Sequence, residues 1–383
     1  MKKRVIFVTY KEYENFEYEK YGLDILERYF ETEVWNLSKF FLGDDIKTED
    51  VYLKQKGIST IKEFIRFLRR YNPKETFLFF HFPPTSKKVF YVEAIVSLMG
   101  FRYSMAYFQP FLTKYNSGSL KEYMSRRKKN YGNVILNALF PPTFNFVATT
   151  ISYKEFPSMW SVKRQNNIMI HTLDYDVFLK IKDEHERLVK DRYILFIDES
   201  YVAHYDYQIF NVKPPFKHPD DYYEPMRNFF DYIEQILGYR VVIAEHPRAH
   251  YSDKSIYGNR EMIRGQTARL VRDAELVLCH ISTAIDYIIL FQKKFIVLYL
   301  NDIMRYFEWG NYYIPLFNYL NIKGLNISQS YNRKMIENVM ANGASKSCKK
   351  YKHYYIKQNG TEEAFFFEIV AEHILNEMDR KIK

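Results

Sequence analysis

The stretch that decides the fold is Val241-Val242-Ile243-Ala244-Glu245-His246-Pro247-Arg248, and a later stretch has the same pattern: Leu276-Val277-Leu278-Cys279-His280-Ile281-Ser282-Thr283. Each is a short apolar run that ends abruptly in polar residues. This pattern is typical of a buried parallel strand whose carboxyl end opens onto a crevice. Ligands of open α/β sheets bind at such strand ends. The two stretches therefore predict a parallel α/β domain with a ligand site.

Strands and helices alternate along the rest of the chain. The first half predicts strands at 4–9, 33–37, 76–80, 102–108 and 144–148, and helices at 23–30, 58–71, 87–99 and 120–138. The second half predicts strands at 193–198, 240–244, 276–279 and 295–298, helices at 221–237 and 283–291, a short helix from Thr267, and a final helix at 362–379. Such alternation predicts mostly parallel sheets with helices on both faces.

A chain of 383 residues is too long for one ordinary core, so we expect two domains. The predicted fold class is α/β, with two Rossmann-like domains facing a central cleft. We place the boundaries at 1–165 and 166–360, and expect a helix at 361–383 that packs back on the first domain. Residues 168–176 are interpreted as the crossover. Asp174-Tyr175-Asp176 is therefore interpreted as structural and not as a metal site.

The charge of the chain narrows the class of partner. It has 56 Lys and Arg against 46 Asp and Glu, a net charge of +10, which permits nucleic acid, anionic lipid or a phosphorylated small molecule. Neither a glycine-aromatic RNA-binding signature nor a zinc-finger spacing is present, which disfavours nucleic acid. One basic run precedes an apolar one and is either a membrane-surface contact or a solvated helix face: Arg126, Arg127, Lys128 and Lys129.

Several other functional classes lack their motifs. No apolar run approaches the roughly 18 to 20 residues of a membrane helix, and residues 1–10 predict a first strand and not a signal peptide. Cys279 and Cys348 give neither a disulfide framework nor a metal spacing. The sequence has no Walker loop, no glycine-rich dinucleotide fingerprint and no His-Glu-x-x-His. We therefore expect a cytoplasmic protein without metal or cofactor, whose membrane contact would be peripheral.

The dipeptide His246-Pro247 is the first candidate for ligand binding. Proline cannot donate to the sheet and ends the strand, so the imidazole before it projects at the sheet edge. There it can donate a hydrogen bond to a phosphate, and Arg248 adds a cation beside it. The alternative is a histidine that only bonds to its own loop.

The pair Ser282-Thr283 is the second candidate, as the N-cap of the helix that begins near Ala284. Because a helix N-terminus attracts anions, capping and phosphate binding are compatible there. Asp286 lies one turn further on, where a carboxylate can reach a ribose hydroxyl or can remain a helix acid. We expect Ser282 and His246 to lie at adjacent strand ends and to hold one nucleotide phosphate.

Two further sets of residues are possible substrate contacts. Asp198 and Glu199 end the strand at 193–198, where they either bind substrate hydroxyls or pin the loop. The second set is Arg260 and Thr267. Between His246 and Thr267 the chain is dense in cations and phenols, which suit an anionic, hydroxylated ligand or form a solvated basic loop.

The second half also resembles a known group of proteins. Several segments, in order and spacing, resemble those of bacterial surface-polysaccharide biosynthesis proteins: Phe196–Glu199, Pro214-Pro215, Asp220–Tyr223, Val242–Arg248, Gly265–Ala268, His280–Tyr287 and Phe291–Val297. More distantly, the His-Pro and Ser-Thr elements resemble those of capsule transferases that use CMP-activated Kdo or sialic acid, and those of the CDP-glycerol polymerases of teichoic acid synthesis.

The resemblance implies a GT-B glycosyltransferase. It implies donor binding by His246, Ser282 and Thr283, with a nucleotide sugar, preferably a CMP-sugar, as donor and a glycan or lipid-linked glycan as acceptor. The first domain would then bind the acceptor and the second the donor. The acid that follows the Ser-Thr pair, here Asp286, lies one position closer to that pair than the corresponding acid in the distant relatives. An inverting transferase needs a base near the acceptor, and the acidic loop with Glu12, Glu14 and Glu17 is its expected source.

Overall fold

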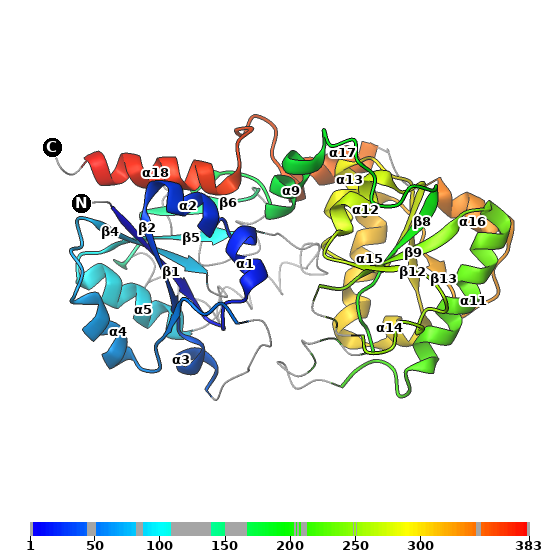
Figure 1. Cartoon of the computed structure of the whole chain (residues 1–383), viewed down its shortest axis with the longest axis horizontal. Helices are drawn as coiled ribbons and strands as arrows, with labels where there is room; N and C mark the ends of the chain where they lie inside the picture. Colours follow the sequence, from blue (N-terminus) through cyan, green and yellow to red (C-terminus); the bar gives the residue numbers. More distant parts are fainter. Residues whose placement is uncertain are drawn as a thin grey trace, which may run out of the picture. The chain divides into compact units, whose positions relative to one another are not determined.

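In a computed structural model of the protein, described residues are 3–43, 51–81, 87–108, 139–149, 167–202, 204, 207, 213–247, 249, 251–341 and 346–380. Within this part, the chain forms two compact units, seen in Figure 1. The first holds the chain up to Leu173 and again from Tyr354 onward, and the second spans Asp174–His353. The basic run Arg126–Lys129 and the predicted helix at 120–138 lie outside the described residues.

The first unit is built on a seven-stranded sheet in the order β3-β2-β1-β4-β5-β6-β7. All its pairings are parallel. The strands are β1 (Arg4–Thr9), β2 (Glu31–Asn36), β3 (Gln55–Gly57), β4 (Thr76–His81), β5 (Arg102–Tyr107), β6 (Phe144–Val147) and β7 (Asn167–Met169). The five strands predicted for this half are confirmed, while the short edge strands β3 and β7 were not predicted.

Both faces of this sheet are buried, because alternate residues of each strand point to opposite sides. Val5 and Phe7 of β1 belong to the core that includes α2 (Leu23–Tyr29) and α18 (Phe366–Arg380). Ile6 and Val8 belong to the core on the other face, which includes α4 (Ile61–Leu68) and α5 (Lys87–Leu98). Continuous apolar strands are what a sheet covered on both sides requires.

Helix α18 returns from the end of the chain to pack on α2, as Figure 1 shows. Its Phe366, Val370 and Ile374 are fully buried in the first core. Gly22 caps the start of α2 with φ +59°, and a Cβ at this position would lie 2.2 Å from the ring of Phe367. The contact between the two helices therefore depends on a glycine.

The second unit has a six-stranded sheet in the order β10-β9-β8-β11-β12-β13, again with parallel pairings only. Its strands are β8 (Tyr193–Ile197), β9 (Arg240–Glu245), β10 (Met262–Arg264), β11 (Leu276–Cys279), β12 (Phe295–Tyr299) and β13 (Leu325–Asn326). Figure 1 shows the sheet between α11 (Asp220–Leu237) and α16 (Arg333–Met340) on one side and α12 (Thr267–Asp273), α13 (Ile285–Leu290) and α15 (Phe307–Leu320) on the other. The predicted strands and helices of this half are confirmed.

Residues 168–176 contain the end of β7, which pairs with β6, and the start of α9 (Leu173–Ile181), so the first sheet runs further along the chain than residue 165. The chain passes from the first unit to the second between Leu173 and Asp174, within this segment. Asp174, in the first turn of α9, accepts a hydrogen bond from the hydroxyl of Tyr287 at 2.7 Å.

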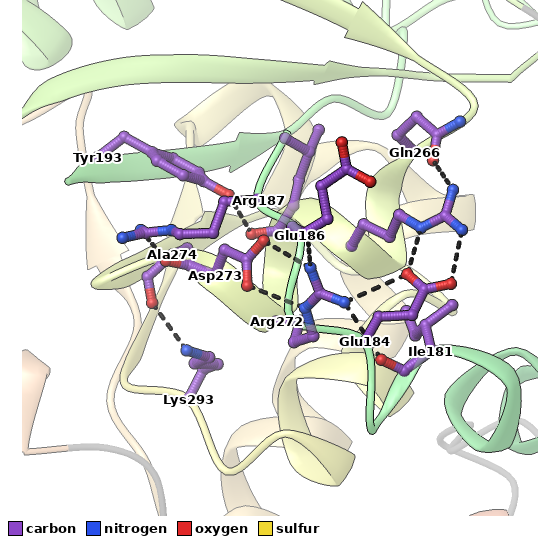
Figure 2. Close-up of polar contacts among 12 residues, drawn as sticks. Ile181, Glu184, Glu186, Arg187, Tyr193, Gln266, Arg272, Asp273, Ala274 and Lys293 are labelled. Atoms are coloured by element: carbon purple, nitrogen blue, oxygen red, sulfur yellow. Dashed lines mark hydrogen bonds and ion pairs between the residues drawn. The ribbon is translucent and has the colours of Figure 1, made fainter. Parts of the chain in front are cut away.

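An ion-pair network, shown in Figure 2, joins segment 181–192 to α12. The carboxylate of Glu184 accepts hydrogen bonds from two nitrogens of Arg269, both at 2.7 Å, and from Arg272 at 3.3 Å. Arg272 also pairs with Asp273 at 2.9 Å and donates to the carbonyl of Glu186 at 2.6 Å. Bidentate arginine pairs fix geometry as well as charge, so these cations hold the chain that enters β8.

Candidate functional site

The strand order places the topological switch of the second sheet between β8 and β11. From β8 the chain moves outward through β9 to β10, and then returns through α12 to β11 on the other side of β8. At such a switch the loops leave the sheet in opposite directions and open a crevice outside the carboxyl ends of the strands. The candidate site is therefore formed by the residues after β8 and β11.

The same order corrects one expectation. The strand before His246 and the strand before Ser282 are not neighbours, because β8 pairs with both β9 and β11 and lies between them. The connection from β10 to β11 passes β9 and β8, so β11 pairs with β8 on the side away from β9. The sequence pattern does not encode this order of pairing. Asp198 and Glu199, at the end of β8, thus lie between the two motifs.

Asp198 pins the loops at this edge. It is 1% exposed, and its carboxylate accepts hydrogen bonds from the backbone of Ser200 at 2.9 Å, from the hydroxyls of Tyr257 at 2.8 Å and Tyr251, and from the backbone of His246. Burial raises the pKa of Asp198 from its ordinary value, and these donors oppose that rise. The sequence offered two interpretations of Asp198, binding of substrate hydroxyls and anchoring of the loop. These contacts are those of a loop anchor.

Glu199 is placed differently from Asp198. Its side chain is 8% exposed at the end of β8, and β8 pairs with β11, whose carboxyl end precedes Ser282. Burial raises the pKa of Glu199 to about 8, and the neighbouring Asp198 adds to the rise. Ser200, the next residue, has φ +51°, a left-handed conformation that is strained for a side chain other than glycine.

Ser282 and Thr283 precede α13 but do not cap it. The helix begins at Ile285 with Ala284 as N-cap, and a tight turn comes first, in which the oxygen of the Ser282 side chain accepts from the Ala284 backbone at 3.1 Å. Thr283 is exposed, whereas Asp286 is only 3% exposed in the first turn of the helix. Thr283 is therefore open to solvent after β11, whereas Asp286 lies in the body of the unit.

His246 lies beside a second histidine that the sequence did not single out. The rings of His204 and His246 are 5.0 Å apart between centroids, and His204 is 8% exposed. Pro247 is exposed at the surface, and its carbonyl accepts from Arg264 at 3.1 and 2.5 Å. Arg248 lies outside the described residues. Two imidazoles at the end of β9 can donate hydrogen bonds to one anion.

His280, by contrast, is a structural residue. It is fully buried, with Nδ1 at 2.9 Å from the carbonyl oxygen of Leu298 and Nε2 at 3.0 Å from the hydroxyl of Tyr222. Because a carbonyl only accepts, Nδ1 carries the proton and Nε2 accepts from Tyr222. Burial lowers the pKa of His280 to about 4, so the ring is neutral at pH 7.

The cations and phenols between His246 and Thr267 are largely engaged within the unit. Lys254 pairs with the buried Glu245. Arg260 bonds to Asp231 and Glu234 of α11, each at 2.6 Å, and is therefore placed on that helix and not at the switch. Thr267 is the first residue of α12 and is half-buried. Lys254 and Arg260 are thus paired with acids of the unit itself, which neither sequence interpretation, ligand binding or a solvated basic loop, had included.

A hollow of about 370 Å³ lies at the start of α11. It contains none of the residues proposed from the sequence for the nucleotide, and its lining includes three carboxylates, which repel a phosphate: Asp220, Asp221 and Glu224. Asp221 accepts from the backbone of His218 at 3.0 Å, and acids in a first turn stabilise a helix. The β8–β11 switch, and not this hollow, therefore remains the candidate site.

The first sheet has its own switch, between β1 and β4. The acidic loop follows β1, and Glu17 is fully buried there, accepting from Lys11 at 2.5 Å and from the backbone of Glu14 at 3.1 Å. Glu14 is 9% exposed and forms the N-cap of α1 (Asn15–Lys20) in a reciprocal capping box with Glu17. Of the candidate bases, Glu17 therefore has a structural role.

His81, at the end of β4, is a residue that the sequence analysis missed. Its ring lies 4.2 Å from that of Tyr21 between centroids, and burial, with Lys11 and Lys20 adding to the effect, lowers its pKa to about 3. The signal that singled out His246 also exists here, because His81 ends an apolar strand two residues before Pro83. A neutral imidazole thus lies at the switch of the first sheet.

Two observations concern metals and membranes. In the part of the chain that the structure describes, no group of three or more His, Cys, Asp or Glu side chains is arranged to hold a metal ion. Among the same residues, none of the helices combines the length and the apolar character needed to cross a bilayer.

Comparison with known proteins defines the class of fold. No protein-family model and no curated protein sequence matches the chain. Among solved structures, a variant of the wall teichoic acid polymerase TagF is 10% identical with a TM-score of 0.54, covering 100% of this chain and 90% of that one. The UDP-GlcNAc 2-epimerase of Methanocaldococcus jannaschii is 12% identical with a TM-score of 0.52, covering 97% and 99%.

A further TagF variant, soaked with CDPG, is 9% identical with a TM-score of 0.52, covering 100% of this chain and 90% of that one. These similarities extend over both units. The chain therefore has the GT-B fold, with two Rossmann-like domains.

Proposed function

We propose that this chain is a transferase of bacterial surface-polysaccharide biosynthesis that uses a nucleotide-activated donor. The observation that carries the proposal is the β8–β11 switch, where strand pairing brings the end of β8, with Glu199, beside the end of β11, which leads to Ser282 and the exposed Thr283. In this reading the nucleotide phosphates bind Ser282, Thr283 and His246, and Asp198 keeps the loops in place. The GT-B fold and the resemblance of residues 193–300 support the same reading.

The first donor class that we propose is a CMP-activated acidic sugar of the Kdo or sialic acid type, transferred with inversion and without metal onto a glycan or lipid-linked glycan. The second is CDP-glycerol, which the similarity to TagF favours. In both cases the base lies in the first domain, where Glu14 is the proposed residue and His81 a further one. A non-catalytic glycan-assembly protein with the same fold is the third reading.

Nucleotide binding tests the proposal directly. Thermal unfolding is measured with CMP, CDP, UDP and GMP at millimolar concentration, and a nucleotide at about 100 times its Kd should add about 2.7 kcal/mol of stability. We expect stabilisation by a pyrimidine nucleotide, with GMP as the control for unspecific phosphate binding. Equal melting temperatures in all samples would contradict the proposal.

The product of the reaction separates the three readings. Incubation with CMP-sugars or CDP-glycerol and mass spectrometry distinguishes a glycosidic bond from a phosphodiester. Slow release of free nucleotide without acceptor identifies an enzyme, whereas nucleotide binding without any turnover identifies the assembly protein.

A further inference from the structure

The outer side of α4, one of the helices that cover the first sheet, carries a row of cations. Phe64 and Leu68 of this helix are fully buried in the core below it. Three exposed residues follow one another on the opposite side: Lys62, Arg66 and Arg69. Residues with the spacing i, i+4 and i+7 lie above one another on a helix, so these side chains face solvent together.

The charge of this row is largely unneutralised. Helix α4 has a single acid, Glu63, which accepts from the backbone of Ser59 at 3.0 Å and lies 3.8 Å from Arg66. Among the residues that the structure describes, no carboxylate pairs with Lys62 or Arg69. An exposed row of cations without paired acids attracts an anionic partner.

Two more cations extend the row beside Phe67. The Nζ atom of Lys56, in β3, lies 3.6 Å from the centre of the Phe67 ring. The guanidinium carbons of Arg70 and Arg66 lie 5.0 and 5.6 Å from the same centre. Cation–π contacts thus hold these side chains on the flank of α4. We call the group the basic row: Lys56, Lys62, Arg66, Arg69 and Arg70.

Helix α5 adds exposed apolar side chains to the same layer of the unit. Its Val92 and Val96 are fully buried in the core that α4 also covers, and Figure 1 shows both helices on one side of the sheet. Tyr91 is 66% exposed and Leu98 75% exposed. Because these two residues are two helical turns apart, they lie on one side of α5, away from its buried valines. The layer therefore presents both cations and apolar groups to solvent.

We propose that the outer side of α4 and α5 docks on an anionic phospholipid membrane. The basic row faces the negative headgroups, and Tyr91 and Leu98 enter the boundary between headgroups and acyl chains. Charge complementarity supports this partner, because the chain carries a net charge of +10 and the basic row is largely free of acids. The surface belongs to the first unit, and the proposal does not rest on the nucleotide site proposed in the second.

Binding to vesicles tests the proposal. Cosedimentation of the full chain is measured with vesicles of phosphatidylcholine that contain about 30% phosphatidylglycerol, and with vesicles of phosphatidylcholine alone. We expect binding to the anionic vesicles and little or none to the neutral ones. Each Lys or Arg near an anionic surface strengthens binding by about fivefold, so Lys62→Gln, Arg66→Gln and Arg69→Gln together should weaken it by about 100-fold. Glutamine is a good helix former, so α4 should remain folded.

The control variant removes the same charge from the second unit. It combines substitutions of three exposed lysines of α16 and α17 (Lys346–Tyr351): Lys334→Gln, Lys346→Gln and Lys349→Gln. Its net charge equals that of the α4 variant. Its affinity for the anionic vesicles should stay within about threefold of the wild type, because the basic row, and not the overall charge, makes the contact.

A further variant, Tyr91→Ser with Leu98→Ser, keeps every charge and tests the apolar part of the contact. It should bind the anionic vesicles about tenfold more weakly, because its side chains no longer enter the acyl boundary. Its affinity for polyglutamate, a soluble polyanion without an apolar layer, should equal that of the wild type.

The outcomes decide between a membrane and other partners. Equal binding to neutral and anionic vesicles, or equal losses in the α4 variant and its control, overturns the proposal. Unchanged vesicle binding by Tyr91→Ser with Leu98→Ser also overturns it, because the cations alone then bind any polyanion. Weaker binding by both surface variants, with the control unchanged, establishes the docking surface. None of these results bears on nucleotide binding, so the two proposals fail separately.

Discussion

Glu93 offers a quantitative test of the structure of the first unit. It lies on α5, is 2% exposed, and burial raises its pKa to about 8 from an ordinary value of 4.5. The folded state therefore prefers the protonated form, and stability falls as pH rises from 4.5 and stops falling above pH 8. A difference of 3.5 pKa units corresponds to about 5 kcal/mol at full ionisation.

The substitution Glu93→Gln removes this titration while it keeps the shape and polarity of the side chain. Because the cost to the wild type is about 1 kcal/mol at pH 5 and nearly 5 kcal/mol at pH 9, the stability advantage of the variant should grow by about 4 kcal/mol between these values. Much of that gain should be present by pH 8.

Urea denaturation from pH 5 to pH 9, followed by tryptophan fluorescence, measures the effect, since Trp35 is fully buried in the same unit. Glu19→Gln, on the exposed face of α1, is the control and should follow the wild type at every pH. Parallel curves for Glu93→Gln and the wild type would refute the reasoning, because they would mean that Glu93 ionises in the folded state as freely as in the unfolded chain.

Three further outcomes follow from individual contacts. His246→Ala should lower nucleotide affinity by about tenfold to a hundredfold in titration calorimetry while the melting temperature stays within a few degrees, and the reverse pattern would make His246 structural. Gly22→Ala should cost about 2 to 4 kcal/mol in urea denaturation, from left-handed backbone strain and overpacking against α18, whereas Gly100→Ala, with φ +80° and open space, should cost only about 1 kcal/mol. Tyr222→Phe leaves Nε2 of His280 without its hydrogen-bond partner and should cost about 1 to 3 kcal/mol in the same assay, and an unchanged midpoint would contradict the stabilising role of this bond.

The sequence by itself determined the elements and their type. Apolar runs such as Val241–Ala244 and Leu276–Cys279 are strands because burial on both faces of a parallel sheet demands continuous apolar residues, and the polar residues after them mark the carboxyl ends. The edge strands β10 and β13 escaped prediction. They have three and two residues, which is too few to show an alternation of apolar and polar residues. They form because a neighbouring strand supplies partners for their backbone hydrogen bonds.

Only the tertiary structure decided how these strand ends combine. The sequence placed His246 and Ser282 at neighbouring strands, but the order of pairing puts β8, and with it Glu199, between them. It also decided the surroundings of the two acids: the hydroxyls of Tyr251 and Tyr257 donate to Asp198, and burial raises the pKa of Glu199 to about 8. Strand order and burial arise from contacts between residues far apart in the chain, and pKa values depend on burial. The local sequence pattern therefore encodes none of the three.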